Sequence, residues 1–237
     1  KGDQIKDYFL KYPYLVSDLS IDFSKESPET IIDKSVLENW TVGLNDTGTT
    51  TNTGGRIFRL RDKLTETFVC TYGDGVADVN VAELVSFHRS HGKIATVTAV
   101  HPSARFGSIE IASDSRVSAF AEKPVSNHWV NGGFFVFDPR IFEYLTIDSI
   151  LEREPLENLA RDSQLMAWQH HGFWHPMDTI RDKNYLDNLW FSKKAKTVAE
   201  TEIGLSRQHD THEKFKPNLF SRILVNLFFK VSSTIGS

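Results

Sequence analysis

The stretch FVCTYGDGVAD, from Phe68 to Asp78, decides the fold, because a short apolar run there delivers an aspartate between two glycines. Residues 68–71 suit a buried strand that stops at a turn signal. Gly73 and Gly75 then allow the backbone to bend sharply and to approach a ligand. Asp74 follows the strand, where open α/β sheets bind their ligands. A plain strand with a Gly-Asp-Gly turn is the alternative interpretation.

The composition is ordinary for a globular α/β domain with a tail, at 237 residues with 24% charged residues. A net charge of -4 and a pI near 6.1 give no sign of nucleic-acid binding. Cys70 is the single cysteine, so it has no internal disulfide partner. This fits a reducing compartment, and we expect a cytoplasmic protein. No apolar run approaches the length of a transmembrane helix.

Before the central stretch, apolar side chains within residues 5–12 fall at helical spacing, and we expect Pro13 to end that helix. We then expect a short strand around residues 20–24, followed by a surface loop and a strand at Trp40–Leu44. The polar run Asn45–Arg56 has the composition of a flexible connector. An anion-binding loop is the competing interpretation, because backbone N–H groups and a guanidinium suit phosphate.

After Asp78, apolar spacing predicts a helix that begins at Val81 and stops at Gly92, with its histidines on the helix surface or at its cap. Ile94–Val100 alternates as a strand, so the strand–helix–strand pattern indicates a parallel crossover. Three further β-like runs within residues 108–139 favour a mixed sheet. These observations predict an α/β, Rossmann-like mixed sheet flanked by helices.

Farther along the chain we expect a helix at Pro155–Asp162, followed by a strand-like run that ends at Asp178. Thr179 can cap a helix over residues 180–191. Its expected buried side consists of Tyr185, Leu186, Leu189 and Trp190.

Asp74 and Asp178 are distant in sequence, yet each ends an apolar strand. If they meet at one edge of the sheet, they form an oxygen-rich site. Magnesium is typically held by one or two carboxylates and substrate phosphates, so this pair would suffice beside a nucleotide. His170, His171 and His175 also invite a zinc interpretation, but they lack a clear helical ligand spacing, which disfavours it.

Several motifs occur in one order along residues 1–190, and with them the chain resembles the sugar-1-phosphate nucleotidyltransferases. The similarity is closest to the members that use CTP and glucose 1-phosphate. The motifs are TGGR at Thr53–Arg56, TYGDGVAD at Thr71–Asp78, RFGSIEI at Arg105–Ile111, EKP at Glu122–Pro124, NGGFFVFDP at Asn131–Pro139, EPL at Glu154–Leu156 and GFWHPMDTIRDK at Gly172–Lys183.

The resemblance implies an enzyme that joins CTP and α-D-glucose 1-phosphate to give CDP-glucose and pyrophosphate for surface polysaccharides such as the O-antigen of lipopolysaccharide. It implies Mg²⁺ as cofactor and a homo-oligomer. By position, Arg56, Asp74, Lys123 and Asp178 would be catalytic, with Asp74 and Asp178 binding the metal. The implied nucleotide or substrate contacts are Thr51, Arg56 and Gly73, and the implied sugar-phosphate contacts are Glu122, Lys123, Asn131 and Gly132.

The residue types agree with that chemistry. A sugar-phosphate oxygen must approach the α-phosphorus of the nucleotide although both reactants are anionic. A metal ion and basic side chains offset this repulsion and stabilise the charge that grows on the phosphates. No protein nucleophile is needed. The plainer interpretations are that Glu122 is a surface charge, Lys123 its solvated neighbour and Asn131 a turn residue.

The chain departs from the family pattern at the first strand and the GGxGTR loop, which do not occur in its 237 residues. That loop is expected to bind the base and triphosphate through backbone N–H groups. We therefore expect this chain alone to be inactive or nearly so. Since Lys1 is not an initiator methionine, the parent protein is expected to be longer, or the chain to be a gene remnant.

The expected domain organisation is a nucleotidyltransferase domain at residues 1–192, a polar linker at 193–218 and an amphipathic helix at 219–237. The helix is too short to span a bilayer. It could pack on another subunit, lie at a membrane surface or begin an appended domain. Two other functions stay open for the chain: a nucleotide-sugar glycosyltransferase and a catalytically silent assembly subunit.

Overall fold

The computed structural model describes residues 2–37, 39–102, 107–122 and 128–192, and the chain divides into two compact units at Thr49/Thr50. The domain expected over residues 1–192 spans both units. The predicted linker and terminal helix, at 193–237, lie outside the described residues.

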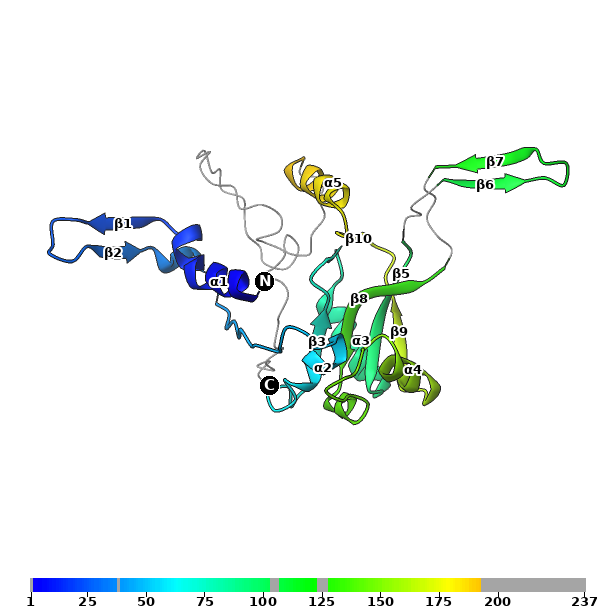
Figure 1. The fold of residues 1–237 in the computed structure, drawn as a ribbon, viewed down its shortest axis with the longest axis horizontal. Helices are drawn as coiled ribbons and strands as arrows, with labels where there is room; N and C mark the ends of the chain where they lie inside the picture. The colour runs from blue at the N-terminus through cyan, green and yellow to red at the C-terminus, as the bar shows by residue number, and fades with distance from the viewer. Residues whose placement is uncertain (1, 38, 103–106, 123–127, 193–237) are drawn as a thin grey trace. The chain divides into compact units, whose positions relative to one another are not determined.

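The first unit contains a helix and a β-hairpin, followed by a single 3₁₀ turn (Figure 1). These elements are α1 (Gly2–Val16), β1 (Leu19–Asp22), β2 (Glu29–Ile32) and η1 (Lys34–Val36). The prediction that Pro13 ends the helix is wrong, since α1 continues to Val16. The predicted strand at Trp40–Leu44 is also absent from this described segment. Trp40 instead packs on Tyr12 of α1, with ring centroids 5.5 Å apart.

The second unit is built on a four-stranded sheet in the order β3-β8-β5-β9. These strands are β3 (Phe68–Thr71), β8 (Val130–Phe137), β5 (Ala95–Val100) and β9 (Leu165–Gln169). β8 pairs antiparallel with both of its neighbours, whereas β5 and β9 are parallel. The mixed sheet is therefore confirmed. The strands of the predicted crossover, β3 and β5, do run in the same direction, but β8 lies between them.

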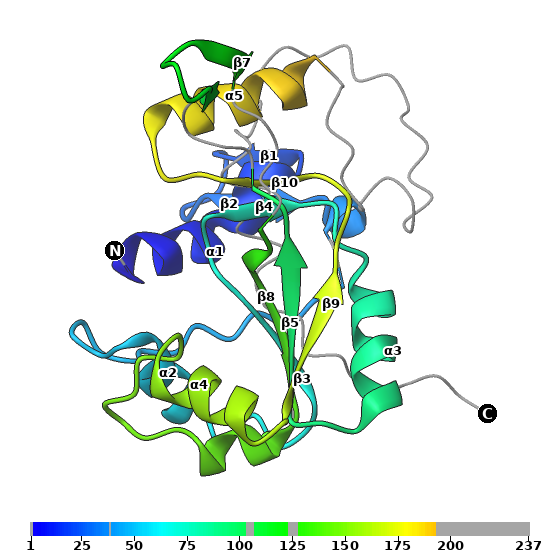
Figure 2. The same cartoon turned by 90° about the vertical axis from the view of Figure 1, so that its right-hand side faces the viewer.

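Helices cover both faces of this sheet (Figure 2). One face packs against α2 (Thr53–Phe58), η2 (Pro139–Glu143) and α4 (Glu154–Arg161), and the other packs against α3 (Val81–His91). The alternation of β8 explains the two cores, because Phe135 and Phe137 enter the first cluster whereas Val136 enters the second. Each fully buried side chain of this size contributes about 1.5–3 kcal/mol.

A short ladder and the last helix form a third cluster. β4 (Gly75–Ala77) pairs antiparallel with β10 (Trp174–Pro176), and α5 (Ile180–Phe191) follows. The predicted cap is confirmed, since Thr179 and Asp182 form a reciprocal capping box. Leu186 is buried against Val76. The expectation that Tyr185 is buried is wrong, because it is 45% exposed.

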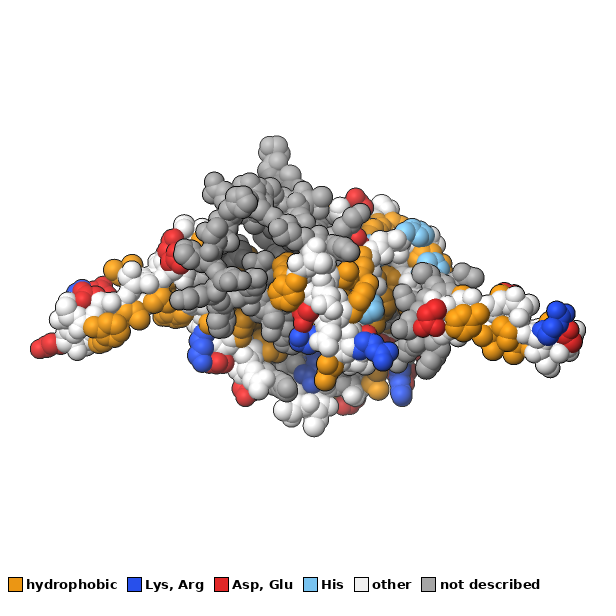
Figure 3. All heavy atoms as spheres, turned by 90° about the horizontal axis from the view of Figure 1, so that it is seen from above, with side chains coloured by type: hydrophobic (Ala, Val, Ile, Leu, Met, Phe, Trp, Pro, Cys, Tyr) orange, Lys and Arg blue, Asp and Glu red, His pale blue; other side chains and the backbone are white. Residues whose placement is uncertain are grey.

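β6 (Ser108–Ile111) and β7 (Val117–Ala121) form a separate hairpin. Of the three β-like runs expected in the mixed sheet, only β8 joins it. The hairpin exposes several large apolar side chains, and such side chains also lie along the hairpin of the first unit (Figure 3). On β6 and β7 they are Ile109, Ile111, Val117 and Phe120.

The end of α3 carries a chain of hydrogen bonds. The N–H of Lys93 donates to His91 Nδ1 (2.9 Å), so the proton of a neutral His91 is on Nε2, 2.8 Å from Thr96 Oγ1. The Thr96 hydroxyl can then donate to His88 Nδ1 at 2.9 Å. His88 is only 4% exposed, so the prediction of a surface position is wrong for it.

Among the described residues, each helix is too short or too polar to cross a bilayer.

Candidate active site

The candidate site lies where the carboxyl ends of β3, β5 and β9 meet the amino end of β8. The N–H of Tyr72, just after β3, donates to Gly133 O of β8 at 3.0 Å. On the other side of β8, Asn131 lies opposite Ala99 of β5, and Ala99 O accepts from the N–H of His170 after β9. Residues from four strand ends therefore converge at the edge where α/β sheets bind ligands.

Asp74 and Asp178 reach adjoining backbone positions through the β4–β10 ladder. Pro176 lies opposite Gly75, and the N–H of Met177 donates to Asp74 O at 2.7 Å. Both aspartates are exposed. A Cβ added at Gly73 would meet no heavy atom within 4 Å, so this turn faces open space. These backbone contacts place the chain at Asp74 beside Met177, the residue before Asp178.

The donor set at this edge fits a magnesium ion that shares its ligands with a substrate. Within the described ranges, no group of three or more His, Cys, Asp or Glu side chains is placed to hold a metal. Magnesium is commonly bound by one or two carboxylates plus phosphate oxygens and water, rather than by a protein cage. Asp74 and Asp178 fit that requirement in chemical type.

Two glycines of β8 bring the strand close to its neighbours. A Cβ at Gly132 would be 2.8 Å from Val100 Cγ1, and one at Gly133, where φ is 80°, would be 2.6 Å from Tyr72 Cδ2. The indole of Trp174 donates from Nε1 to Gly132 O at 2.8 Å. Gly132 therefore attaches β10, which precedes Asp178, to the start of β8.

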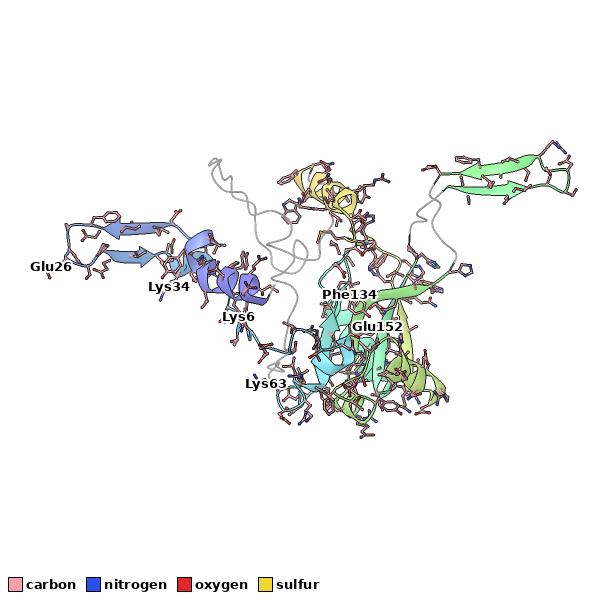
Figure 4. All side chains as sticks on the ribbon, viewed as in Figure 1. Lys6, Glu26, Lys34, Lys63, Phe134 and Glu152 are labelled. Atoms are coloured by element: carbon pink, nitrogen blue, oxygen red, sulfur yellow. The ribbon has the colours of Figure 1, made fainter. Side chains whose placement is uncertain are left out.

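A polar network holds Asn131. Its Nδ2 donates to Tyr72 Oη (3.2 Å), and its Oδ1 accepts from the N–H of Gly133 (2.8 Å). Tyr72 Oη in turn donates to Glu152 Oε1 at 2.6 Å, and Figure 4 labels Glu152. Burial, and then the hydrogen bond to Glu152, raise the pKa of Tyr72, so the phenol stays a neutral donor. The Asn131 amide is thus oriented before any ligand binds.

Glu152 also connects this network to α2. Its Oε2 accepts from Thr53 Oγ1 at 2.7 Å, and Thr53 Oγ1 accepts from the N–H of Leu151 at 2.9 Å. The first turn of α2, which is flanked by Thr51 and Arg56, is therefore tied through one carboxylate to Tyr72 at the end of β3.

The glycines of the TGGR motif have a packing role. A Cβ at Gly55 would be 2.1 Å from Ile147 O, which is backbone and cannot be displaced cheaply. The N–H of Gly55 donates to Ser149 O (3.0 Å) and that of Arg56 to Asn52 O (2.9 Å). Since these two amides are already used, they do not contribute to the anion-binding loop that was the competing interpretation of residues 45–56. For Arg56, the guanidinium remains the candidate phosphate-binding group.

The predicted sugar-phosphate residues are only partly brought together. Asn131 and Gly132 lie at the site. Glu122 directly follows β7, in the separate hairpin that β7 forms with β6, and its carboxylate lies near Gly107. Lys123 lies outside the described residues. The roles of Glu122 and Lys123 stay predictions.

The three clustered histidines have separate partners. His170 Nε2 lies 3.0 Å from Asp78 Oδ1 and 3.2 Å from Phe173 O, and two oxygen neighbours require that this nitrogen carries the proton. His175 Nε2 lies 3.4 Å from Asp182 Oδ1. The His171 ring contacts Trp129. This arrangement gives the zinc interpretation no support.

Cys70 is not a nucleophile at this site. Burial, with a contribution from the nearby Glu152 charge, raises the pKa of its thiol to about 12. A thiol needs a lowered pKa to react as a thiolate near neutral pH. The cysteine acts as a small apolar side chain on the face of the sheet that packs against α2 and α4.

Tyr72, Glu152 and Trp174 are site residues that the sequence analysis missed. Tyr72 and Trp174 lie inside the quoted motifs. The motifs therefore marked these segments as important, but did not indicate a role for these two side chains. Glu152 precedes the EPL motif by two residues but hydrogen-bonds a residue 80 positions away. No local pattern reports a pairing at that distance.

Comparison with known proteins gives concordant results. Residues 40–171 match the family model described as "Nucleotidyl transferase". The chain is 43% identical over 199 residues to a glucose-1-phosphate cytidylyltransferase of Salmonella typhimurium, which covers 82% of this chain and 76% of the relative. A probable glucose-1-phosphate cytidylyltransferase of Bacillus subtilis is 38% identical over 193 residues, covering 80% and 74%. Mannose-1-phosphate guanylyltransferase catalytic subunit beta of Xenopus tropicalis is 31% identical over 147 residues, covering 58% and 40%.

Proposed function

The chain belongs to the nucleotidyl transferase family, and from this premise we propose that it converts CTP and α-D-glucose 1-phosphate to CDP-glucose and pyrophosphate. The observation that carries the proposal is the similarity to bacterial cytidylyltransferases along most of both chains. The adjoining positions of Asp74 and Asp178 support it, because the reaction needs a site for polyphosphate and metal.

In this proposal Asp74 and Asp178 bind Mg²⁺ together with phosphate oxygens. When bound, the ion neutralises charge on the nucleotide phosphates and stabilises the departing pyrophosphate. The two carboxylates orient that complex at the strand ends. Arg56 and Lys123 offset the repulsion between the two anionic substrates. Thr51 and Gly73 contact the nucleotide.

The reaction itself requires no protein nucleophile. An oxygen of the sugar phosphate forms a bond to the α-phosphorus, and the bond from that phosphorus to the bridging oxygen breaks, which releases pyrophosphate. The attacking phosphate is already ionised near neutral pH, so no general base is needed. Catalysis then rests on positioning, which in favourable cases supplies about 7 kcal/mol or more, and on charge stabilisation.

On the sugar side, Asn131, Gly132, Glu122 and Lys123 are the proposed contacts. One N–H of the Asn131 amide is donated to Tyr72, and an amide group has two such donors. The second N–H is then available to a sugar hydroxyl or phosphate oxygen. Because Tyr72 and Gly133 already hold the amide, binding orders no further side chain at this position.

The test is pyrophosphate release from CTP, UTP and dTTP in separate reactions with glucose 1-phosphate and magnesium. Both this chain and a version that carries a GGxGTR segment should be measured. We expect turnover in the second version, with CTP preferred, and loss of turnover in Asp74→Ala and Asp178→Ala. Turnover by the 237-residue chain itself would contradict the expectation that it is inactive alone.

Two results would favour the alternatives. Release of CDP from CDP-glucose in the presence of an acceptor, without pyrophosphate chemistry, would indicate a glycosyltransferase. A folded version that carries the GGxGTR segment, yet binds neither nucleotide nor sugar phosphate, would indicate an assembly subunit.

We also propose that the product supplies surface-polysaccharide synthesis, including lipopolysaccharide O-antigen, and that the protein works in the cytoplasm, where CTP is available. We propose a homo-oligomer in which residues 219–237 contribute to the interface. Light scattering on the full chain and on one that lacks these residues tests this, and an unchanged mass would contradict it.

A further inference from the structure

Three aromatic rings cluster at the site edge of the sheet. They belong to His101, directly after β5, Trp129, directly before β8, and His171, after β9. The ring centroids of His101 and Trp129 are 3.8 Å apart, and those of Trp129 and His171 are 5.4 Å apart. Since Val100 pairs with Val130, His101 and Trp129 are the next residues across the same two strands.

Trp129 is not a core residue. It remains 39% exposed and belongs to none of the three apolar clusters found among the described residues. The imidazoles contact it from two neighbouring strand ends, which limits the orientations of the indole. A large aromatic ring that is held by its neighbours and still reaches the surface offers apolar contact area at little cost in side-chain entropy.

The position of the ring specifies its ligand. Trp129 precedes Asn131 by two residues, which corresponds to about 7 Å along an extended chain. That is roughly the reach of one hexose and its phosphate. The proposed nucleotide contacts, Thr51 and Gly73, belong to other segments. The cluster therefore adjoins Asn131, the proposed sugar contact, along β8.

We propose that Trp129, braced by His101 and His171, is a stacking platform for the hexose of the sugar 1-phosphate. The proposal rests on the proposed function and extends it to a residue that sets sugar affinity. A hexose presents apolar C–H groups on its ring faces and hydroxyls around its rim. The indole buries one ring face from water, while polar groups such as the Asn131 amide bind the rim.

The experiment measures binding of glucose 1-phosphate by calorimetry to the full chain and to its variants. Trp129→Ala should weaken binding about tenfold, as expected for loss of one stacking contact. Trp129→Leu keeps apolar volume without a flat face and should lose about as much. Trp129→Phe keeps a ring and should stay within about threefold of the parent.

Two controls isolate the hexose contact. Inorganic phosphate, which lacks the sugar, should bind the parent and Trp129→Leu equally. Phe191→Ala removes an aromatic ring that is 53% exposed on α5, outside the cluster, and should leave glucose 1-phosphate binding unchanged. Thermal unfolding of each variant shows whether a loss of binding results from misfolding. If Trp129→Ala is misfolded, the comparison of Trp129→Phe with Trp129→Leu tests the proposal.

The outcomes separate this inference from the proposed function. If the full chain binds glucose 1-phosphate and Trp129→Leu binds it equally well, the platform is refuted, while turnover by the version that carries the GGxGTR segment keeps the enzyme proposal. If Trp129→Leu weakens CTP binding instead, the ring serves the base, and the hexose proposal is refuted. If neither the full chain nor a version that carries the GGxGTR segment binds glucose 1-phosphate or CTP, the proposed function fails, and this inference fails with it.

Discussion

The polar side chains at the two ends of the four-stranded sheet differ: at one end they hydrogen-bond to one another, and at the other they are exposed. At the amino end of β5, His91, Thr96 and His88 satisfy one another in a chain of hydrogen bonds. Nearby, Arg140 donates from Nε to Asp138 Oδ1 at 2.8 Å and from Nη2 to Gly92 O at 3.3 Å. These groups are occupied by one another.

At the carboxyl end, polar groups are held in place but remain accessible. Asp74, Asp178 and Asn131 are all exposed, although their backbones are fixed by the β4–β10 ladder and by β8. A polar group whose partners are all internal contributes to stability, whereas a positioned and exposed one is available to a ligand. Changes at the two ends should therefore separate effects on stability from effects on activity.

The largest expected effect is on activity at the carboxyl end. In a version of the protein that turns over, Asp74→Asn or Asp178→Asn should lower kcat about 10³-fold, because a neutral amide replaces a carboxylate that binds the metal. For Asp74→Asn the melting temperature should change little, since this side chain is exposed. Steady-state kinetics and calorimetry test this. Asp138→Asn, at the other end, is the matched control and should keep its activity; a comparable kcat loss there would break the comparison.

The next effect is on stability at the amino end. Burial, and to a smaller extent the neighbouring His91, lower the pKa of His88 from 6.5 to about 4. The unfolded chain therefore binds the proton first, so stability is full above pH 6.5 and falls by about 3 kcal/mol as the pH decreases to 4. Urea unfolding across this range should show a shallower pH dependence in His88→Asn. Equal slopes in the parent and the variant would contradict the assignment.

Two glycines sharpen the same distinction. Gly55→Ala places a Cβ against backbone Ile147 O and should destabilise the protein by about 2 kcal/mol, even though alanine favours helix. Gly73→Ala meets no neighbour and should leave stability within about 0.5 kcal/mol, while weakening nucleotide binding. Thermal unfolding and CTP titration measure both effects. The reverse ranking of stabilities would refute the packing role of Gly55.

The smallest predicted effect concerns the residue that orients Asn131. Tyr72→Phe removes the hydroxyl between Asn131 and Glu152 and should cost about 1 kcal/mol of stability. The KM for glucose 1-phosphate should rise about threefold, with kcat nearly unchanged. Tyr144→Phe is the matched control, because Tyr144 Oη donates to Asp162 Oδ2 (2.9 Å) away from the site. An equal rise in KM in both variants would show that Tyr72 has no specific role.

Much of the secondary structure could be predicted from local patterns. The strand at 68–71, the helix after Asp78 and the Thr179 cap all follow from apolar spacing and capping chemistry within a few residues. The errors arose where a distant contact overrode a local signal. Trp40 packs on α1 instead of entering a strand, and His88 is buried on Thr96 instead of lying at the surface.

The site divides in the same way. The motifs identified Asp74, Asn131 and Asp178 as candidates, but could not distinguish the glycines of TGGR from Gly73. The structure separates them, because Gly55 is packed against backbone whereas Gly73 faces open space. The sequence shows that a glycine is present, but only the atoms around it in the folded structure show whether it is needed for packing.

By itself, the sequence determined many of the helix and strand segments from Phe68 onward and the chemical types available to the site, because these depend on side chains a few positions apart. Only the tertiary structure decided that β8 lies between β3 and β5, that Asp74 O accepts from the N–H of Met177, and that Glu152 joins α2 to Tyr72. Those pairings depend on long-range burial and hydrogen bonding between segments. Many alternative pairings would satisfy the same local patterns, and only packing of the whole domain selects among them.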